Sequence, residues 1–199
     1  GEWLTWRNGD RTFLPWDDMP HHHRADTAKP VRADFASFDP DRDLAFVDCY
    51  LGYVWNTLFH MQELPGKTDA GLLRSGAIPD YLFRAFDLVK ARAGADLSIH
   101  GSACSPLTQF FELFGYEAAL IAFLDDAAKV HAILDRLAES TVAWALALVE
   151  RGADAIDLSS AFVAAPFLSR AQYREFVVPY ERRVNEAIKA AGGIVYTHT

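Results

Sequence analysis

The sequence predicts an α/β protein with a parallel sheet, most simply part of a (β/α)8 TIM barrel. Three observations support this prediction. Strand-like segments alternate with helical ones, a glycine separates each helical segment from the next strand, and the strands are short and nearly all apolar. Such alternation is typical of parallel strands joined by crossover helices. Strands that are covered on both faces are apolar throughout.

The first part of the chain has a different character. We expect residues 1–45 to form an irregular N-terminal segment, and residues 46–199 to form the barrel domain. Asn8-Gly9 between Trp6 and Phe13 predicts a tight β-hairpin. The histidine run at 21–23 indicates a solvated loop rather than a metal site, because successive side chains cannot all point at one ion.

The barrel segments follow in order. The apolar and aromatic stretch 44–53 predicts a strand with an active end, which would place Tyr50 in a substrate site. The segment 80–93 has apolar residues at helical spacing, with Pro79 and Asp80 as start signals and Gly94 as the stop. The remaining predicted elements are a strand at 96–100, a short helix from Pro106, a long helix from Asp125 or Asp126 to Arg151, a strand at 155–159, a helix from Ser169 kinked at Pro179, and a strand at 194–198.

An open doubly wound sheet and a closed barrel both fit this order. No glycine-rich phosphate loop follows any strand, so the dinucleotide-binding form of the open sheet gains no support. A closed barrel typically needs about 250 residues. The last apolar strand would also be left as an uncovered edge. We therefore expect the natural protein to continue beyond Thr199.

Polar residues stand in or at the end of three predicted strands. They are His100, Asp157 and His198. In parallel barrels the active site lies at the carboxyl ends of the strands, and burying unpaired polar groups is costly. We expect these three side chains to share one rim, with Asp157 and His100 as catalytic candidates and Ser159 beside them as a substrate-binding one. The alternative is that each merely hydrogen-bonds a neighbouring loop.

Three other residues are of types that can carry a chemical role. Cys104 is either a nucleophile or metal ligand, or a small buried apolar side chain, and the second interpretation is favoured. His131, on a helix flank, is expected at the surface. The sequence does not decide the role of His60.

Composition and charge exclude several partners. The 199 residues carry a net charge of −8 and no run of Lys and Arg, which argues against nucleic acid and anionic membranes. The apolar stretches are shorter than the roughly 20 residues of a membrane span. No leader is visible at Gly1-Glu2-Trp3. With only two cysteines, a cytoplasmic location is expected.

From about residue 80 onward the chain resembles the uroporphyrinogen decarboxylase superfamily. The matching segments are DDAAKVHAILDRL (125–137), RGADAIDLSS (151–160), LSRAQYREFVVPY (168–180) and GGIVYTHT (192–199). The resemblance implies a (β/α)8 barrel enzyme that acts on a small molecule.

The resemblance implies one of two chemistries. The decarboxylases remove four acetate carboxyls from uroporphyrinogen without a metal, but their arginine-rich N-terminal signature is absent here and the segment 99–115 differs from theirs. The related methyltransferases move a methyl group between a corrinoid protein and a thiol. They bind zinc through a His-x-Cys pair and a distant Cys. His198 matches the first of these ligands, and the position of the paired cysteine lies beyond Thr199.

We therefore expect a zinc-dependent methyltransferase that moves a methyl group between a corrinoid or small methyl donor and a thiol. His198 would bind zinc, and a corrinoid protein would be a partner. Asp157 would orient the histidine or hold the substrate. The first alternative is a uroporphyrinogen decarboxylase of porphyrin biosynthesis, in which Asp157 and His100 contact a pyrrole nitrogen or a propionate. The second is a non-catalytic barrel that binds a corrinoid protein or ligand.

Overall fold

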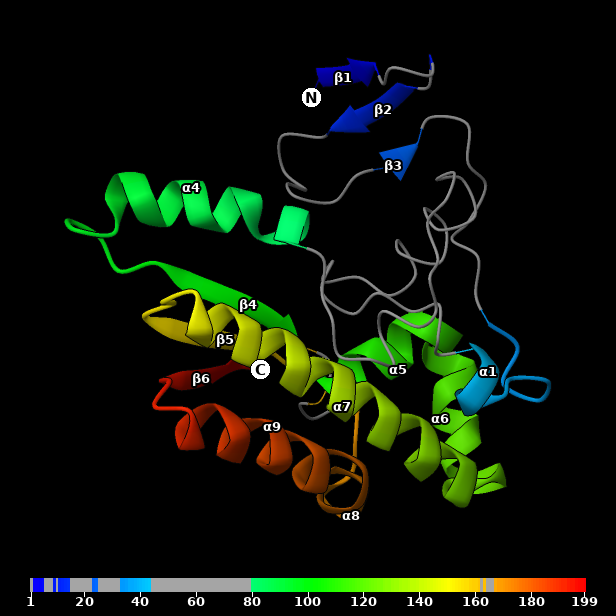
Figure 1. The fold of residues 1–199 in the computed structure, drawn as a ribbon. Helices are drawn as coiled ribbons and strands as arrows, with labels where there is room; N and C mark the ends of the chain where they lie inside the picture. The colour runs from blue at the N-terminus through cyan, green and yellow to red at the C-terminus, as the bar shows by residue number, and fades with distance from the viewer. Residues whose placement is uncertain are drawn as a thin grey trace. The chain divides into compact units, whose positions relative to one another are not determined.

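The computed structural model describes residues 2–5, 9, 11–14, 23–24, 33–43, 80–161, 163 and 167–199. The chain divides into two units, Gly1–Val31 and Arg32–Thr199 (Figure 1). The strand predicted at 44–53 lies outside the described residues, as do Tyr50, His60 and the first two histidines of the 21–23 run.

The first unit contains the predicted hairpin. β1 (Glu2–Thr5) pairs antiparallel with β2 (Arg11–Leu14), with Trp3 opposite Phe13, and β3 (His23–Arg24) pairs with β2. Gly9 adopts a φ of 90°, a left-handed conformation that glycine reaches without a Cβ clash. The hairpin prediction is therefore confirmed.

The second unit is built on a parallel sheet in the order β4 (His100–Cys104), β5 (Ala155–Ser159) and β6 (Val195–His198). The parallel sheet was predicted, and so were the bounds of β5. The strand predicted at 96–100 is wrong, because β4 begins at His100 instead of ending there.

Local hydrogen bonds explain the shift of β4. The amides of Asp96 and Leu97 both donate to Ala93 O, at 3.0 and 2.8 Å, which closes a turn after the preceding helix. The stretch that forms the strand contains Gly101, whose added Cβ would lie 2.7 Å from Leu148 Cδ1. Glycine is needed there because the strand approaches a helix closely, although in the sequence it resembles a loop residue.

The helices of the second unit mostly follow the predicted order. They are α1 (Pro40–Asp43), η3 (Asp80–Phe83), α4 (Arg84–Ala93), α5 (Pro106–Phe114), α6 (Tyr116–Asp125), α7 (Ala127–Glu150), α8 (Arg170–Gln172), η4 (Tyr173–Val177) and α9 (Val178–Ala190). Three begin at oxygen-bearing caps: Ser105, Asp126 and Ser169 accept from the third amide of α5, α7 and α8. The sequence analysis missed α6. None of the described helices is long and apolar enough to cross a membrane.

The kink expected at Pro179 takes the form of a π-helical turn. Tyr173–Val177 (η4) is a π-helix, and α9 begins directly after it with Pro179 in its first turn. Proline has no amide hydrogen for the carbonyl four residues earlier, so the regular bonding pattern is interrupted at this point.

Two buried clusters hold the second unit together. The first lies among α5, α6, α7 and α9 and receives Phe35 and Phe38, whose rings pack edge-on against Phe114 at 5.3 and 5.0 Å. The second lies between the sheet and the helices α7 and α9, which run along it (Figure 1). Its members are Phe83, Ala103, Trp144, Ala145, Leu148, Ile156, Leu158, Val184 and Ile188.

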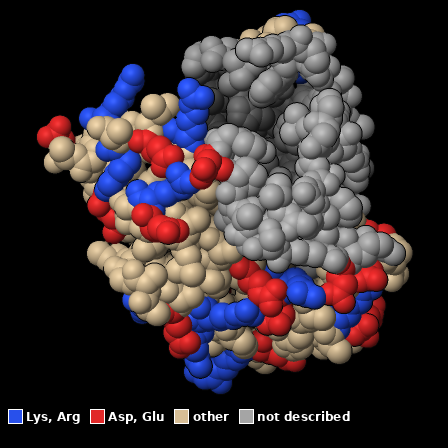
Figure 2. Space-filling view, viewed as in Figure 1, with Lys and Arg blue, Asp and Glu red and all other residues tan. Residues whose placement is uncertain are grey.

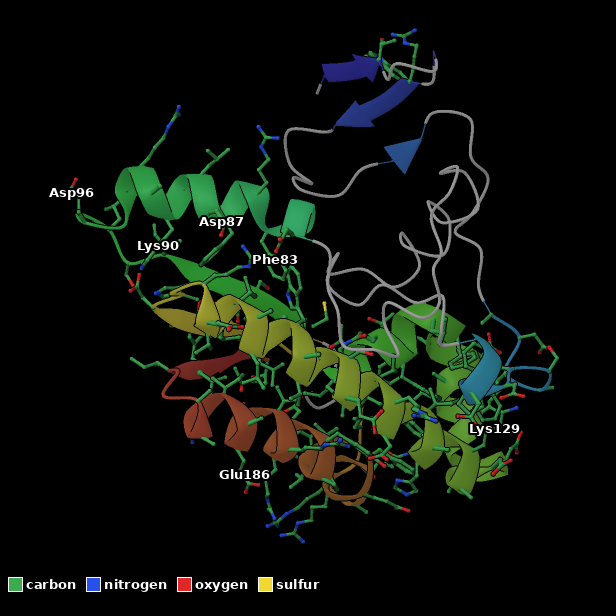
Figure 3. The ribbon with its side chains drawn as sticks, viewed as in Figure 1. Phe83, Asp87, Lys90, Asp96, Lys129 and Glu186 are labelled. Carbon is green, nitrogen blue, oxygen red and sulfur yellow. The ribbon has the colours of Figure 1, made fainter. Side chains whose placement is uncertain are left out.

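The helix α4 is attached through Phe83, the residue just before it (Figure 3). The Phe83 residue is 1% exposed, and its ring stacks on that of Trp144 with 4.6 Å between the ring centres. The Arg151 guanidinium lies over the Phe83 ring, 4.2 Å from its centre. Arg151 also pairs with Asp87 at 2.8 Å. Val89, one of the apolar residues at helical spacing in the segment 80–93, is instead 50% exposed.

Replacing Phe83 by alanine should therefore destabilise the second unit. We expect Phe83→Ala to lower the free energy of unfolding by about 3–5 kcal/mol, since it leaves a cavity beside Trp144. Leu88→Ala, on the same helix but 53% exposed, should change it by about 0.5 kcal/mol or less. Urea denaturation measures both, and equal effects would contradict the anchoring role of Phe83.

Candidate active site at the carboxyl ends of the strands

The sheet has one face toward the helices and one face away from them, here called the inner face. Ile156 and Leu158 are fully buried on the helix side, and Gly101 abuts Leu148 there. Successive side chains along a strand point to opposite faces. The residues directly before and after those on the helix side therefore belong to the inner face. They are His100, Ser102, Cys104, Ala155, Asp157, Ser159, Tyr196 and His198.

The parallel register arranges these residues in rows. Cys104, Ser159 and His198 are paired neighbours at the carboxyl ends, and we call them the rim row. Ser102, Asp157 and Tyr196 form the row below it. Adjacent strands lie about 4.8 Å apart, so Ser159 stands between Cys104 and His198.

His100 does not belong to the rim. It pairs with Ala155 at the amino end of the sheet. Its Nδ1 lies 3.1 Å from the Tyr196 hydroxyl, and its Nε2 lies 2.9 Å from Ser98 Oγ. The expectation that His100, Asp157 and His198 share one rim is therefore wrong for His100, because β4 starts at this residue. In parallel barrels the amino end of the sheet serves stability more than chemistry.

Asp157 lies one row below the rim, and the structure places it near Ser159. Its Oδ1 is shielded from solvent and has no hydrogen-bond partner among the residues that the structure describes. Buried polar atoms are rarely left in this state. The atom is therefore suited to accept a hydrogen bond from a bound molecule.

Three polar residues behind the rim were missed by the sequence analysis. Ser105 and Ser160 are fully buried, and Glu181 is 6% exposed. Ser160 Oγ donates a hydrogen bond to Glu181 Oε1 and lies 3.1 Å from Ser105 Oγ. Glu181 shares a buried helical stripe with Val177, Val184 and Ile188. An acidic residue at that spacing was the signal that could have revealed it.

Burial raises the pKa of Glu181, although hydrogen bonds from Ser160 and Ser105 act in the opposite direction. Among the described residues, no Lys, Arg or His forms an ion pair with this carboxylate. The ionised form therefore depends on hydroxyl groups for its stabilisation.

The described part of the chain holds an incomplete set of metal ligands. No three His, Cys, Asp or Glu side chains there come together to hold a metal, whereas zinc takes three or four protein ligands. His198 can supply one. Cys104, also in the rim row, is 7% exposed, which agrees with the expectation of a small buried side chain.

His131 lies outside the site, between helices. Its Nδ1 is 2.6 Å from the Tyr180 hydroxyl, and its side chain is 38% exposed. Burial raises the pKa of Tyr180 to about 12, so this hydroxyl stays protonated at neutral pH. The expected surface position of His131 is correct only in part.

Comparison with known proteins identifies the relatives of this chain. The family model for uroporphyrinogen decarboxylase (URO-D) matches residues 67–199. Uroporphyrinogen decarboxylase of Rhodococcus erythropolis is 40% identical over 62 residues, or 31% of this chain and 17% of that protein. The enzyme of Mycolicibacterium smegmatis is 31% identical over 120 residues, or 57% and 33%.

A solved methyltransferase from Methanosarcina mazei superposes with a TM-score of 0.51 at 21% identity, over 63% of this chain and 39% of that protein. At this identity the likeness concerns the fold. The matched part of the chain thus spans a third or less of these two curated relatives.

Glu181 gives the stability of the protein a predictable pH dependence. Because the pKa of Glu181 is raised in the folded state, its contribution to the free energy of unfolding is complete below the ordinary pKa of 4.5. This contribution is lost as pH rises through the folded-state pKa. Glu181→Gln mimics the protonated acid and lacks this loss. Between the ordinary pKa and the folded-state pKa of Glu181, the free energy of unfolding of the variant minus that of the parent protein should therefore increase with pH.

Thermal or urea unfolding at pH values from 4 upward measures this difference. The matched control is Glu186→Gln, an exposed position on the same helix, whose curve should run parallel to that of the parent protein. A Glu181→Gln curve that is also parallel would contradict the prediction.

Proposed function

Since the chain belongs to the uroporphyrinogen decarboxylase family, we propose that it forms part of a (β/α)8-barrel enzyme that transfers a methyl group to or from a thiol. The donor or acceptor on the other side would be a corrinoid or a small methylated compound, with a corrinoid protein as the partner. His198 would be one ligand of a zinc ion, and the other ligands would come from outside the described residues. The observation that supports this choice most is the position of His198 in the rim row, beside Ser159.

The chemistry of the inner face favours methyl transfer over decarboxylation. The strands β4, β5 and β6 contain no Lys or Arg. A tetrapyrrole with many carboxylates is best recognised by cations, above all by arginine. The polar groups of the inner face are instead hydroxyls, imidazoles, the Cys104 thiol and the Asp157 carboxylate. The negative charge of Asp157 would repel such a substrate.

Three residues of the inner face then have a defined task. His198 would hold the zinc ion through a nitrogen of its imidazole ring. Zinc, when bound, lowers the pKa of a thiol so that the thiolate is available near neutral pH. Ser159 offers a hydroxyl next to that position, and Asp157 Oδ1 accepts a hydrogen bond from the substrate.

The second candidate is a uroporphyrinogen decarboxylase. The names of the curated relatives favour it. The unpaired Asp157 Oδ1 is also suited to accept a pyrrole N–H. This candidate needs no metal, which makes the two proposals separable by experiment.

Metal analysis of the full-length protein tests the zinc ligand. We expect stoichiometric zinc, and His198→Ala should weaken its binding by more than the 10- to 100-fold that the loss of an outer-shell partner typically costs. His100→Ala, at the opposite end of the sheet, is the control and should retain the metal. A zinc-free protein that decarboxylates uroporphyrinogen would refute the methyltransferase. A protein inactive on every methyl donor and porphyrinogen would favour a binding module.

Asp157 provides a second test, which applies to both candidate activities. Asp157→Asn removes the charge of the acceptor, and a hydrogen bond to a charged group contributes about 1.5–3 kcal/mol. We expect kcat/KM to fall by about 10- to 100-fold with little change in thermal stability. Ser102→Ala, in the same row, should have a much smaller effect, and equal losses would argue against a specific role of Asp157.

A further inference from the structure

Glu181 lies where the carboxyl end of the sheet meets α9. Its side chain is 6% exposed, in the first turn of the helix, and accepts a hydrogen bond from Ser160 Oγ. The described residues offer it hydroxyl groups and no cation. A buried carboxylate without a cation is costly for a protein, so an isosteric apolar residue would stabilise the helix better.

The two serines that Glu181 engages stand one residue past the ends of β4 and β5. The amide of Ser105 donates to Ser159 O at 2.8 Å, and the amide of Ser160 donates to His198 O at 2.8 Å. These two hydrogen bonds extend the pairing of the strands beyond the last paired residues of the sheet. Ser160 therefore holds the backbone of His198 directly.

The alternation of side chains along the strands places the contacts of Glu181 and the inner face on opposite sides of the sheet. Cys104 and Ser159 project from the inner face, so the residues after them, Ser105 and Ser160, project toward the helices. Glu181 thus contacts the rim from behind, without entering the face on which a substrate would lie.

We propose that Glu181 is a positioning residue, which holds Ser105 and Ser160 by hydrogen bonds and, through the Ser160 amide, fixes the place of His198 in the rim row. The inference rests on the proposed function only because it takes the rim row to be the functional site.

The hydroxyl groups allow both protonation states of Glu181. When ionised, the carboxylate accepts from Ser160 Oγ. When protonated, the carboxyl group donates to Ser160 Oγ. Ser160 then donates to Ser105 Oγ at 3.1 Å, and Ser105 donates to Thr108 Oγ1 at 3.0 Å. Which hydroxyl group donates and which accepts along this chain of hydrogen bonds therefore depends on the charge of Glu181.

The other titratable groups near Glu181 come from the neighbouring elements η4, α7 and β5. Tyr173 of η4 is close enough for the charge of Glu181 to raise its pKa, after the larger effect of burial. Across from α9, Asp135 and Glu139 of α7 pair with Arg183. Asp157 of β5 belongs to the inner face. His198 is linked to Glu181 through the Ser160 backbone alone.

Nuclear magnetic resonance of the full chain tests the proposal. In the parent protein, the Ser160 amide and the His198 carbonyl should shift with pH at the same midpoint as the Glu181 carboxyl carbon. In Glu181→Gln, which can accept the same hydrogen bond but cannot titrate, this step should disappear while thermal stability is retained. Glu186→Gln is the control, since Glu186 extends from α9 away from the sheet (Figure 3) and should keep the step.

A second variant separates positioning from simple packing. Glu181→Leu fills the space but accepts no hydrogen bond, so we expect hydrogen exchange at the Ser160 amide to accelerate about tenfold or more and the His198 resonances to move. Unchanged exchange in Glu181→Leu, or a pH step that persists in Glu181→Gln, would overturn the proposal. Neither readout involves zinc or methyl transfer, so a metal-free protein would refute the proposed function and leave this inference standing.

Discussion

The second unit depends on the burial of one face of the β4–β5–β6 sheet against α7 and α9. Ile156 and Leu158 are fully buried there, together with Val184 and Ile188 from α9. A shift of one residue in any strand would exchange its two faces and expose these side chains to water. The hydrophobic contact therefore fixes the register, and the register in turn determines which polar residues appear on the inner face.

Ser105 shows how tightly the sheet and the helices are connected. Its side chain caps α5 by accepting from the Thr108 amide at 3.2 Å, while its own amide donates to Ser159 O. The start of a helix and the end of a strand are thus set by one residue. The same residue lies beside Ser160 and Glu181, so α9 is connected to this junction as well. Displacement of either helix would disturb the rim row.

Charge is distributed differently on the helices and on the inner face. On the face seen in Figure 2, Lys and Arg side chains lie among Asp and Glu side chains. Several of these pairs are structural: Arg151 joins α7 to Asp87 of α4, and Arg183 joins α9 to Asp135 of α7. The inner face of β4, β5 and β6 instead presents hydroxyls, imidazoles, a thiol and one carboxylate. The ion pairs therefore join helix to helix, and the polar groups of the inner face lie apart from them.

The sequence by itself determined the parallel α/β architecture, the hairpin, the limits of α7 and β5 and the family, because periodicity, caps and glycine stops are local signals. It failed where an element depends on a distant neighbour. Gly101 reads as a loop residue until Leu148 packs against it, so β4 was placed too early and His100 was assigned to the wrong end of the sheet. Glu181 was not predicted as a site residue, because its hydrogen bonds come from Ser160 and Ser105, which are distant in the sequence. Close approach and burial are properties of the folded chain, and only the tertiary structure decides them.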